Sequence, residues 1–327
     1  MFEPSADIRR QAEALVEKGY RYLEDEEYDE ALECAAQLEE LGYSGAYELA
    51  ALTFTRRGEL ERAIEALERG VKMAPDAWVN WHLLGDLRAE DERWQDSEAA
   101  YEQALGCADV WAGAIRISQA ETATRQGQFD RALGFLDEVD DPDFKWETTK
   151  KRVLNLMYLE SYAAALELST SALGEDLDDL DVDDYSALAE IAAMNGWARA
   201  QSGHPVDEIR QSALEHLGWF GVTPDGLDLI REVDERFADE AVAYRLMLAG
   251  VAPDEEEQHG FYVTQEVLAS SEQEAFAFAE EIENAVGAVE LQVEEIQALE
   301  MEDPEGAAEM ALGVLWRSGR AMFDLED

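Results

Sequence analysis

The segment WQDSEAAYEQA, residues 94–104, decides the fold, because its first four residues are one of five copies of a spaced pair. In each copy an aromatic residue or leucine is followed three positions later by a small residue. The copies are Tyr28/Ala31, Leu60/Ala63, Trp94/Ser97, Phe129/Ala132 and Tyr162/Ala165, and successive copies lie 32, 34, 35 and 33 residues apart. A period near 34 residues is typical of stacked helix-turn-helix units, since each unit buries its apolar face only against the next one.

Other residues of the same repeat also fit a helical hairpin. When the first residue of each pair is numbered 17 within its unit, Trp81 lies at position 4, Leu84 at 7, Gly85 at 8 and Tyr101 at 24. Small residues at positions 8 and 20 let two antiparallel helices approach closely, and large residues fill the space between them. In the preceding unit Pro75 lies at position 32, where it ends the second helix. The pattern resembles the tetratricopeptide repeat (TPR) family, which implies a mostly α, TPR-like α-solenoid.

This resemblance covers roughly residues 8–217 and predicts five to six helix-turn-helix units. The fourth and fifth units rest on spacing and helical periodicity, because Arg116 and Thr149 replace the large apolar residue expected there. A sixth, irregular unit follows, with Gly196 at position 8. The acidic stretch 175–184 before it is expected to be a solvated loop.

The remaining third of the chain changes from helical to extended periodicity. Thr223-Pro224-Asp225 predicts the start of a helix that runs to about Phe237 and caps the array. Strand, strand, helix and strand are then expected at 242–251, 261–268, 271–287 and 289–296, with a loop over 253–260. This order predicts a small α+β (β-β-α-β) domain, in which we recognise no known family. The expected domains are a TPR-like helical repeat array at 1–217, a capping helix and linker at 218–240, and the small α+β domain at 241–327.

The charge of the chain has two competing interpretations. The formal net charge is -51, from 76 acidic and 25 basic residues. A localised polyanionic surface would imitate nucleic acid, whereas acids on all sides would suit concentrated salt, where screening removes their mutual repulsion. Both the repeat array and the C-terminal part are acidic, which favours the second interpretation. We therefore expect a cytoplasmic protein of a halophilic organism.

Several classes of function are not expected. The chain starts without the basic and apolar regions of a secretory signal, and no stretch approaches the roughly 20 apolar residues of a membrane helix. Cys34 and Cys107 stand alone and are expected to be core thiols, so neither a metal nor a cofactor is expected. The few basic residues leave no electrostatic footprint for direct nucleic-acid binding. No histidine lies in a catalytic motif, and carboxylates on a solvated face do not form an acid/base pair, so no catalytic residue is expected.

The resemblance implies that the first helices of successive units line a concave groove. Positions 2, 5, 9, 12 and 13 of each unit would face it and hold the partner. The candidates are Tyr20, Leu52, Arg56, His82, Asp86, Glu121, Arg125, Lys150, Leu154, Tyr158 and Trp197. Arg56, Arg125 and Lys150 would pair either with a partner's carboxylates or with neighbouring acids of the chain itself. The carboxylate clamp of the chaperone-binding subclass is not recognisable here.

The C-terminal tail offers a second set of candidates. Arg317 and Arg320 lie beside Trp316 and are two of the three basic residues after position 240. They would form either an anion or partner site, or ion pairs that settle a turn between short strands at the edge of the sheet. An exposed strand edge in this domain would also allow homo-oligomers.

Three hypotheses for function follow. The leading one is a non-catalytic scaffold or adaptor whose groove binds a peptide or helix of another protein. A polyanionic nucleic-acid mimic that sequesters a basic protein would show a continuous negative stripe. An enzyme with its site in the C-terminal domain would show a pocket near His259 or Arg317.

Overall fold

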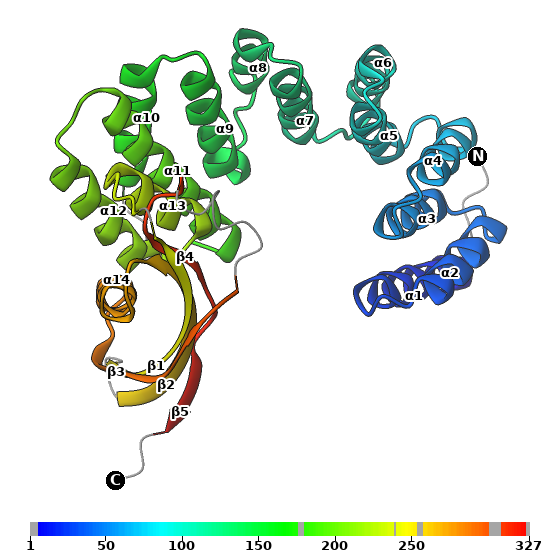
Figure 1. Cartoon of the computed structure of the whole chain (residues 1–327). Coiled ribbons are helices and arrows are strands. Elements are labelled where there is room, and N and C mark those ends of the chain that lie inside the picture. The colour runs from blue at the N-terminus through cyan, green and yellow to red at the C-terminus, as the bar shows by residue number, and fades with distance from the viewer. Residues whose placement is uncertain (1–5, 176–179, 239, 254–257, 301–308, 325–327) are drawn as a thin grey trace. The chain divides into compact units, whose positions relative to one another are not determined.

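The computed structural model describes residues 6–175, 180–238, 240–253, 258–300 and 309–324 (Figure 1). The chain divides into two units, unit 1 at Met1–Phe144 and unit 2 at Lys145–Asp327. Each unit is described by itself.

The described part of unit 1 consists of four consecutive helical hairpins. Their helices are α1 (Ala6–Glu24), α2 (Tyr28–Glu40), α3 (Gly45–Arg56), α4 (Leu60–Met73), α5 (Trp78–Glu90), α6 (Trp94–Leu105), α7 (Ala112–Arg125) and α8 (Phe129–Leu136), followed by a short 3-10 turn at Pro142–Phe144. Each second helix begins at the large residue of the repeated pair. The small residues of these pairs, Ala31, Ala63, Ser97 and Ala132, are 0% exposed. The spacing therefore predicted both the period and the contact that closes each hairpin.

The third hairpin shows why the small positions are needed. A Cβ atom placed on Gly85 would lie 2.4 Å from the ring of Tyr101, so only glycine lets α6 pack this closely on α5. As expected, Pro75 lies just beyond the end of α4. The first helices also contact one another, α1 with α3, α3 with α5, and α5 with α7. We call the surface formed by these four helices the first-helix face.

Unit 2 begins with two more hairpins. They consist of α9 (Lys145–Tyr158) with α10 (Tyr162–Leu173), and α11 (Val182–Gln201) with α12 (Val206–Phe220). The sixth hairpin is thus present. Part of the acidic stretch is not the expected loop, because the Asp181 side chain accepts a hydrogen bond from the backbone nitrogen of Asp184 (2.8 Å) and the next residues begin α11. Acids are favourable at a helix N-terminus, which explains this difference. Residues 176–179 of the stretch lie outside the described residues.

A single helix follows the sixth hairpin. Helix α13 (Pro224–Val233) begins where expected, with the Thr223 hydroxyl accepting a hydrogen bond from the backbone nitrogen of Gly226 (3.2 Å). It ends at Val233 rather than near Phe237.

The sheet of unit 2 is antiparallel. Its elements are β1 (Val242–Pro253), β2 (Gln258–Ala269), α14 (Glu272–Ala285), β3 (Val289–Ala298), β4 (Gly313–Arg317) and β5 (Ala321–Asp324). The strand order is β3-β1-β2-β4. Strand β4 pairs with residues 265–268 of β2, and β5 pairs with residues 259–262 of the same strand. The expected β-β-α-β order is present, and two short strands complete one edge. Figure 1 shows the sheet curved around α14.

One hydrophobic core joins this sheet to the preceding helices. Leu246, Phe261 and Val267 of the sheet share a cluster with Leu217 of α12 and Leu229 of α13. The boundary between units 1 and 2 lies between Phe144 and Lys145, whereas the sequence predicted domain boundaries near residues 217 and 240. Whether the expected segments fold alone stays a prediction, which is tested below.

Candidate functional site

The first-helix face of unit 1 contains two hollows. The first, of about 300 Å³, is lined by Val16 and Tyr20 of α1, Tyr43, Ser44, Gly45, Glu48, Ala77, Val79 and Asn80, and we call it the α1–α5 hollow. The Tyr20 hydroxyl donates a hydrogen bond to the Glu48 carboxylate (2.7 Å). Burial and the neighbouring Glu48 raise the pKa of Tyr20, so this phenol stays a neutral donor. The hollow therefore combines apolar side chains, Val16 of α1 and Val79 of α5, with the polar groups of Tyr20, Glu48 and Asn80.

The second hollow is more polar. It also measures about 300 Å³, and its lining consists of Asp86, Ala89, Glu90, Tyr101, Ser118, Glu121, Thr122 and Arg125. We call it the α5–α7 hollow. The hydroxyl of Tyr101 donates a hydrogen bond to Asp86 (2.8 Å) and lies 3.3 Å from the hydroxyl of Thr122. Burial, followed by the charge of Asp86, raises the pKa of Tyr101. Three carboxylates and one guanidinium give the hollow an excess of negative charge.

A histidine, a serine and an aspartate meet beside this hollow, but not in a catalytic arrangement. The Nε2 atom of His82 lies 2.9 Å from the Ser118 hydroxyl and 3.6 Å from the Asp86 carboxylate. A serine nucleophile requires a histidine that contacts serine through one ring nitrogen and the carboxylate through the other. Here both groups approach the same nitrogen, so the histidine cannot relay a proton from Ser118 towards Asp86.

The remaining unit 1 candidates lie on the same face. Leu52 on α3 is partly exposed, and Arg56 at the end of α3 is exposed. Arg56 makes no hydrogen bond or ion pair among the described residues. Arg125 is exposed, lines the α5–α7 hollow and lies 5.6 Å from the ring centroid of Trp94. Both arginines are thus open to an incoming group.

The unit 2 candidates have other surroundings. Lys150 on α9 pairs with Glu147 (2.8 Å) and Glu190 (3.3 Å). Burial lowers the pKa of Lys150, but the two carboxylates more than offset this, so the net shift is upward. Its charge is therefore satisfied within the chain.

Three more candidates belong to unit 2. Leu154 is partly exposed and Tyr158 is exposed on α9, whereas Trp197 on α11 packs against the hydrophobic core under the sheet. A Trp197 side chain packed in this way serves the fold of unit 2.

The two tail arginines converge on one buried carboxylate. Glu283 of α14 is fully buried and accepts hydrogen bonds from Arg317 (2.6 and 3.0 Å) and Arg320 (2.8 and 3.2 Å). A third residue, Gln265 on β2, donates a further hydrogen bond to Glu283 through its side-chain amide (2.7 Å). Burial alone would raise the pKa of Glu283, but the two guanidinium groups outweigh it and hold this pKa below its usual range. These ion pairs fasten the β4–β5 connection to α14, as the second interpretation of the tail expected.

Unit 2 has its own hollows. One of about 500 Å³ lies between α12 and α14 and is lined by Asp207, Arg210, Gln211, Leu214, Glu215, Glu281, Asn284 and Ala285. The guanidinium of Arg210 is held there by Asp234 (2.9 Å) and Glu281. Another, of about 10 Å³, is lined by Leu227, Phe278, Leu312 and neighbours. Neither these two nor the next hollow is lined by His259 or Arg317, near which the enzyme hypothesis requires a pocket.

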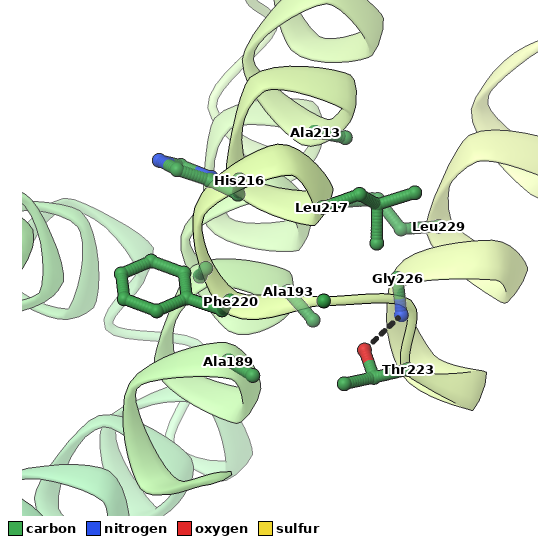
Figure 2. A pocket seen from close by; sticks show the side chains of 11 residues that line it. Ala189, Ala193, Ala213, His216, Leu217, Phe220, Thr223, Gly226 and Leu229 are labelled. Carbon is green, nitrogen blue, oxygen red and sulfur yellow. Dashed lines mark hydrogen bonds between the residues drawn. The ribbon is translucent and has the colours of Figure 1, made fainter. Parts of the chain in front are cut away.

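The hollow under the sixth hairpin is nearly filled by side chains. Figure 2 shows it between α11, α12 and α13, with Ala193, Leu217 and Leu229 around it and Thr223 bonded to Gly226. Its volume of about 10 Å³ leaves room for little more than one water molecule. The region serves packing between helices.

The described residues contain no group of three or more His, Cys, Asp or Glu side chains placed to hold a metal ion. In the same part of the chain, no helix has the length and apolar character needed to cross a membrane. Cys34 is buried, as a core thiol should be, whereas Cys107 is only half-buried, and neither forms a disulfide.

Comparisons with known proteins bear on the fold. No family model and no curated protein matches the chain. PilW, described as a widely conserved type IV pilus biogenesis factor, superposes with a TM-score of 0.53 and 14% identity, over 65% of this chain and 96% of PilW. PilF of Pseudomonas aeruginosa superposes with a TM-score of 0.50 and 11% identity, over 69% of this chain and 99% of PilF. The chain has a TPR-like fold. A tetratricopeptide repeat protein from Parabacteroides merdae also matches, with a TM-score of 0.44 and 13% identity, over 69% of this chain and all of that protein.

Within the TPR-like array, sequence reasoning missed some residues that line the hollows. Glu48 lies at position 5 of its unit and Glu90 at position 13, both of which were expected to face the groove. The signal was therefore present at these two positions. Tyr43 and Ser118 lie outside the expected positions, and only the packing of neighbouring repeats brings them to the hollows.

Proposed function

We propose that this chain is a non-catalytic scaffold that binds a peptide or helix of another protein on the first-helix face of unit 1. The observation that carries the proposal is the pair of hollows, each of about 300 Å³, on that face. The α1–α5 hollow offers apolar surface at Val16 and Val79. The α5–α7 hollow offers the charged side chains of Glu90 and Arg125. A partner side chain that entered either hollow would exchange water for packed contacts without reorganising the repeats.

The hollows fit binding better than catalysis. The α5–α7 hollow is lined mainly by polar side chains, of which Glu90 and Arg125 are exposed and can contact a partner directly. His82, which lies beside this hollow, contacts Ser118 and Asp86 through a single nitrogen. A role in holding a partner needs only the shape and polarity that these side chains provide.

Site-specific photo-cross-linking tests the proposal. A photoreactive amino acid at Leu52 on the first-helix face, introduced in the source cells, is expected to capture a protein partner that mass spectrometry identifies. The same amino acid at Glu65, exposed on α4, is the matched control. The identified partner is then purified, and its affinity is measured by calorimetry against the wild type, Leu52→Glu and Glu65→Gln.

Leu52→Glu is expected to weaken this binding at least about tenfold, since it places a charge where the partner packs. Glu65→Gln is expected to leave the affinity unchanged. Equal affinity for Leu52→Glu and the wild type would remove the first-helix face from the function.

We also propose that the protein works in the cytoplasm of a halophilic organism. The net charge of -51 supports this, because mutual repulsion of exposed acids destabilises a folded chain unless salt screens it. Thermal unfolding followed by circular dichroism is expected to show a midpoint that rises steadily as potassium chloride is increased from the millimolar to the molar range. A midpoint that is independent of salt would contradict this environment.

A further inference from the structure

The α5–α7 hollow holds two opposite charges of neighbouring repeats that do not pair with each other. Glu90 at the end of α5 and Arg125 at the end of α7 both line it. Glu90 makes no hydrogen bond or ion pair among the described residues, and Arg125 lies over the ring of Trp94. Because the two charged side chains line the same hollow and do not pair with each other, both are available to charged groups of a partner.

These two residues belong to a longer series. Both occupy position 13 of their repeats, and the same position holds Glu24 in the first hairpin and Arg56 in the second. The sign of the charge therefore alternates along unit 1. All four side chains are exposed, and neither Glu24 nor Arg56 has an ion pair within the part of the chain that the structure describes. We call these four residues the position-13 row.

The spacing of the row follows from the packing of the repeats. Equivalent positions of stacked units form a line, and the axes of packed helices lie about 8–10 Å apart. The four charges of the row form no ion pair with one another among the described residues, so they are available to a partner. A partner that offers charges of the opposite order at the same interval would satisfy all four.

An extended, proline-rich segment has this interval. A polyproline II helix has three residues per turn and rises about 3.1 Å per residue, so every third side chain points the same way about 9 Å further on. Such a segment is also largely ordered before it binds, which lowers the entropic cost of docking. An α-helix reaches a similar interval only between residues seven apart.

We propose that the position-13 row recognises a partner segment in polyproline II conformation whose charges alternate in sign at every third residue. This rests on the proposed function, because it specifies the chemistry of the partner on the first-helix face. The row reads minus, plus, minus, plus from Glu24 to Arg125, so the partner reads plus, minus, plus, minus beside it.

Two labelled peptides of equal composition test the rule by fluorescence anisotropy. In the alternating probe, lysine, glutamate, lysine and glutamate are separated by two prolines each. In the blocked probe, two lysines precede two glutamates at the same spacing. Titrations use the full chain at the lowest salt at which circular dichroism shows the complete helical signal, because salt screens exposed charges. The wild type is expected to bind the alternating probe about tenfold more tightly, since the blocked probe loses two pairs and gains two repulsions.

The double variant Arg56→Glu, Glu90→Arg changes the row to minus, minus, plus, plus without changing the net charge. Because both side chains are exposed and unpaired, the fold is expected to persist, and the preference is expected to switch to the blocked probe. An equal affinity of the wild type for both probes, no binding of either, or an unchanged preference in the variant would overturn the inference. Cross-linking at Leu52 does not depend on this preference, so the proposed function stands or fails separately.

Discussion

Units 1 and 2 of this chain use the same residue types in different ways. Unit 1 divides its apolar side chains among several small clusters, such as the one around Leu67 and Leu84, and leaves Arg56 and Glu90 exposed. Unit 2 gathers α12, α13, α14 and the sheet around one large core and encloses Glu283 with Arg317 and Arg320 beside it. The stacked repeats hold many of their charges in surface ion pairs, such as Arg57 with Asp29, and leave others, such as Arg56 and Glu90, exposed and unpaired among the described residues. The comparison teaches that a shared core can also enclose a carboxylate completely, as it does Glu283.

The largest expected effect concerns the shared core. A fragment of residues 241–327 is expected not to fold, because it lacks Leu217 and Leu229, which belong to the same hydrophobic core as Leu246 and Phe261. A fragment of residues 145–327 is expected to fold. Far-ultraviolet circular dichroism and urea denaturation distinguish the two outcomes. Cooperative unfolding of the 241–327 fragment would show instead that the α+β domain expected from the sequence folds on its own.

The next effect concerns the buried carboxylate. Glu283→Ala is expected to lower the free energy of unfolding of the 145–327 fragment by about 3 to 5 kcal/mol, because it leaves Arg317 and Arg320 without their partner. Glu280→Ala on the same helix, which breaks no ion pair among the described residues, is the control and is expected to cost less than about 0.5 kcal/mol. Urea denaturation measures both. A loss of less than about 1 kcal/mol in the free energy of unfolding for Glu283→Ala would show that the ion pairs of Glu283 with Arg317 and Arg320 do not stabilise the fold.

The same group predicts a dependence on pH. The pKa of Glu283 is lower in the folded chain than in the unfolded chain, so the unfolded state takes up its proton first as the pH falls. Its contribution to stability is complete above the unfolded pKa of about 4.3 and is lost as the pH falls through the folded value. The difference in unfolding free energy between the wild type and Glu283→Gln is therefore expected to shrink below about pH 4. A difference that stays constant with pH would contradict the assigned ion pair.

The smallest effect concerns the repeats. Gly85→Ala places a methyl group 2.4 Å from the buried Tyr101 ring and is expected to cost about 1 to 3 kcal/mol. Gly134→Ala in α8 meets no atom within 4 Å and is expected to stabilise the chain by about 0.4 to 1 kcal/mol. Hydrogen exchange is expected to quicken in α5 and α6 of the first variant and to stay unchanged in β1 and β2, since repeats transmit little beyond their neighbours. Faster exchange throughout the chain would show that the two units unfold as one.

Sequence patterns predicted the repeats well because each hairpin is closed by a local contact. The pair Trp94/Ser97 and the residue Gly85 lie within one unit, so their spacing is visible in the chain. The resemblance to the TPR family implied groove positions for Tyr20, Asp86 and Arg125, and in the structure each of them lines a hollow. Ser118 and Tyr43 could not be predicted in this way, because their approach depends on how one repeat packs on the next.

The C-terminal third was less visible. The order of β1, β2, α14 and β3 followed from alternation and capping, but no pattern showed that Leu217 and Leu229 would share the core of the sheet. The partner of Arg317 and Arg320 was also hidden, because Glu283 is one of many acids in the sequence and only its burial distinguishes it.

By itself the sequence determined the repeat period, the hairpin contacts, the acidic surface and the alternating charges at position 13, since these depend on spacing and composition along the chain. Only the tertiary structure decided which charges are enclosed and which stay open. The physical reason is that desolvation depends on how distant segments pack together, and a carboxylate becomes a fixed partner, as Glu283 does, only where that packing excludes water.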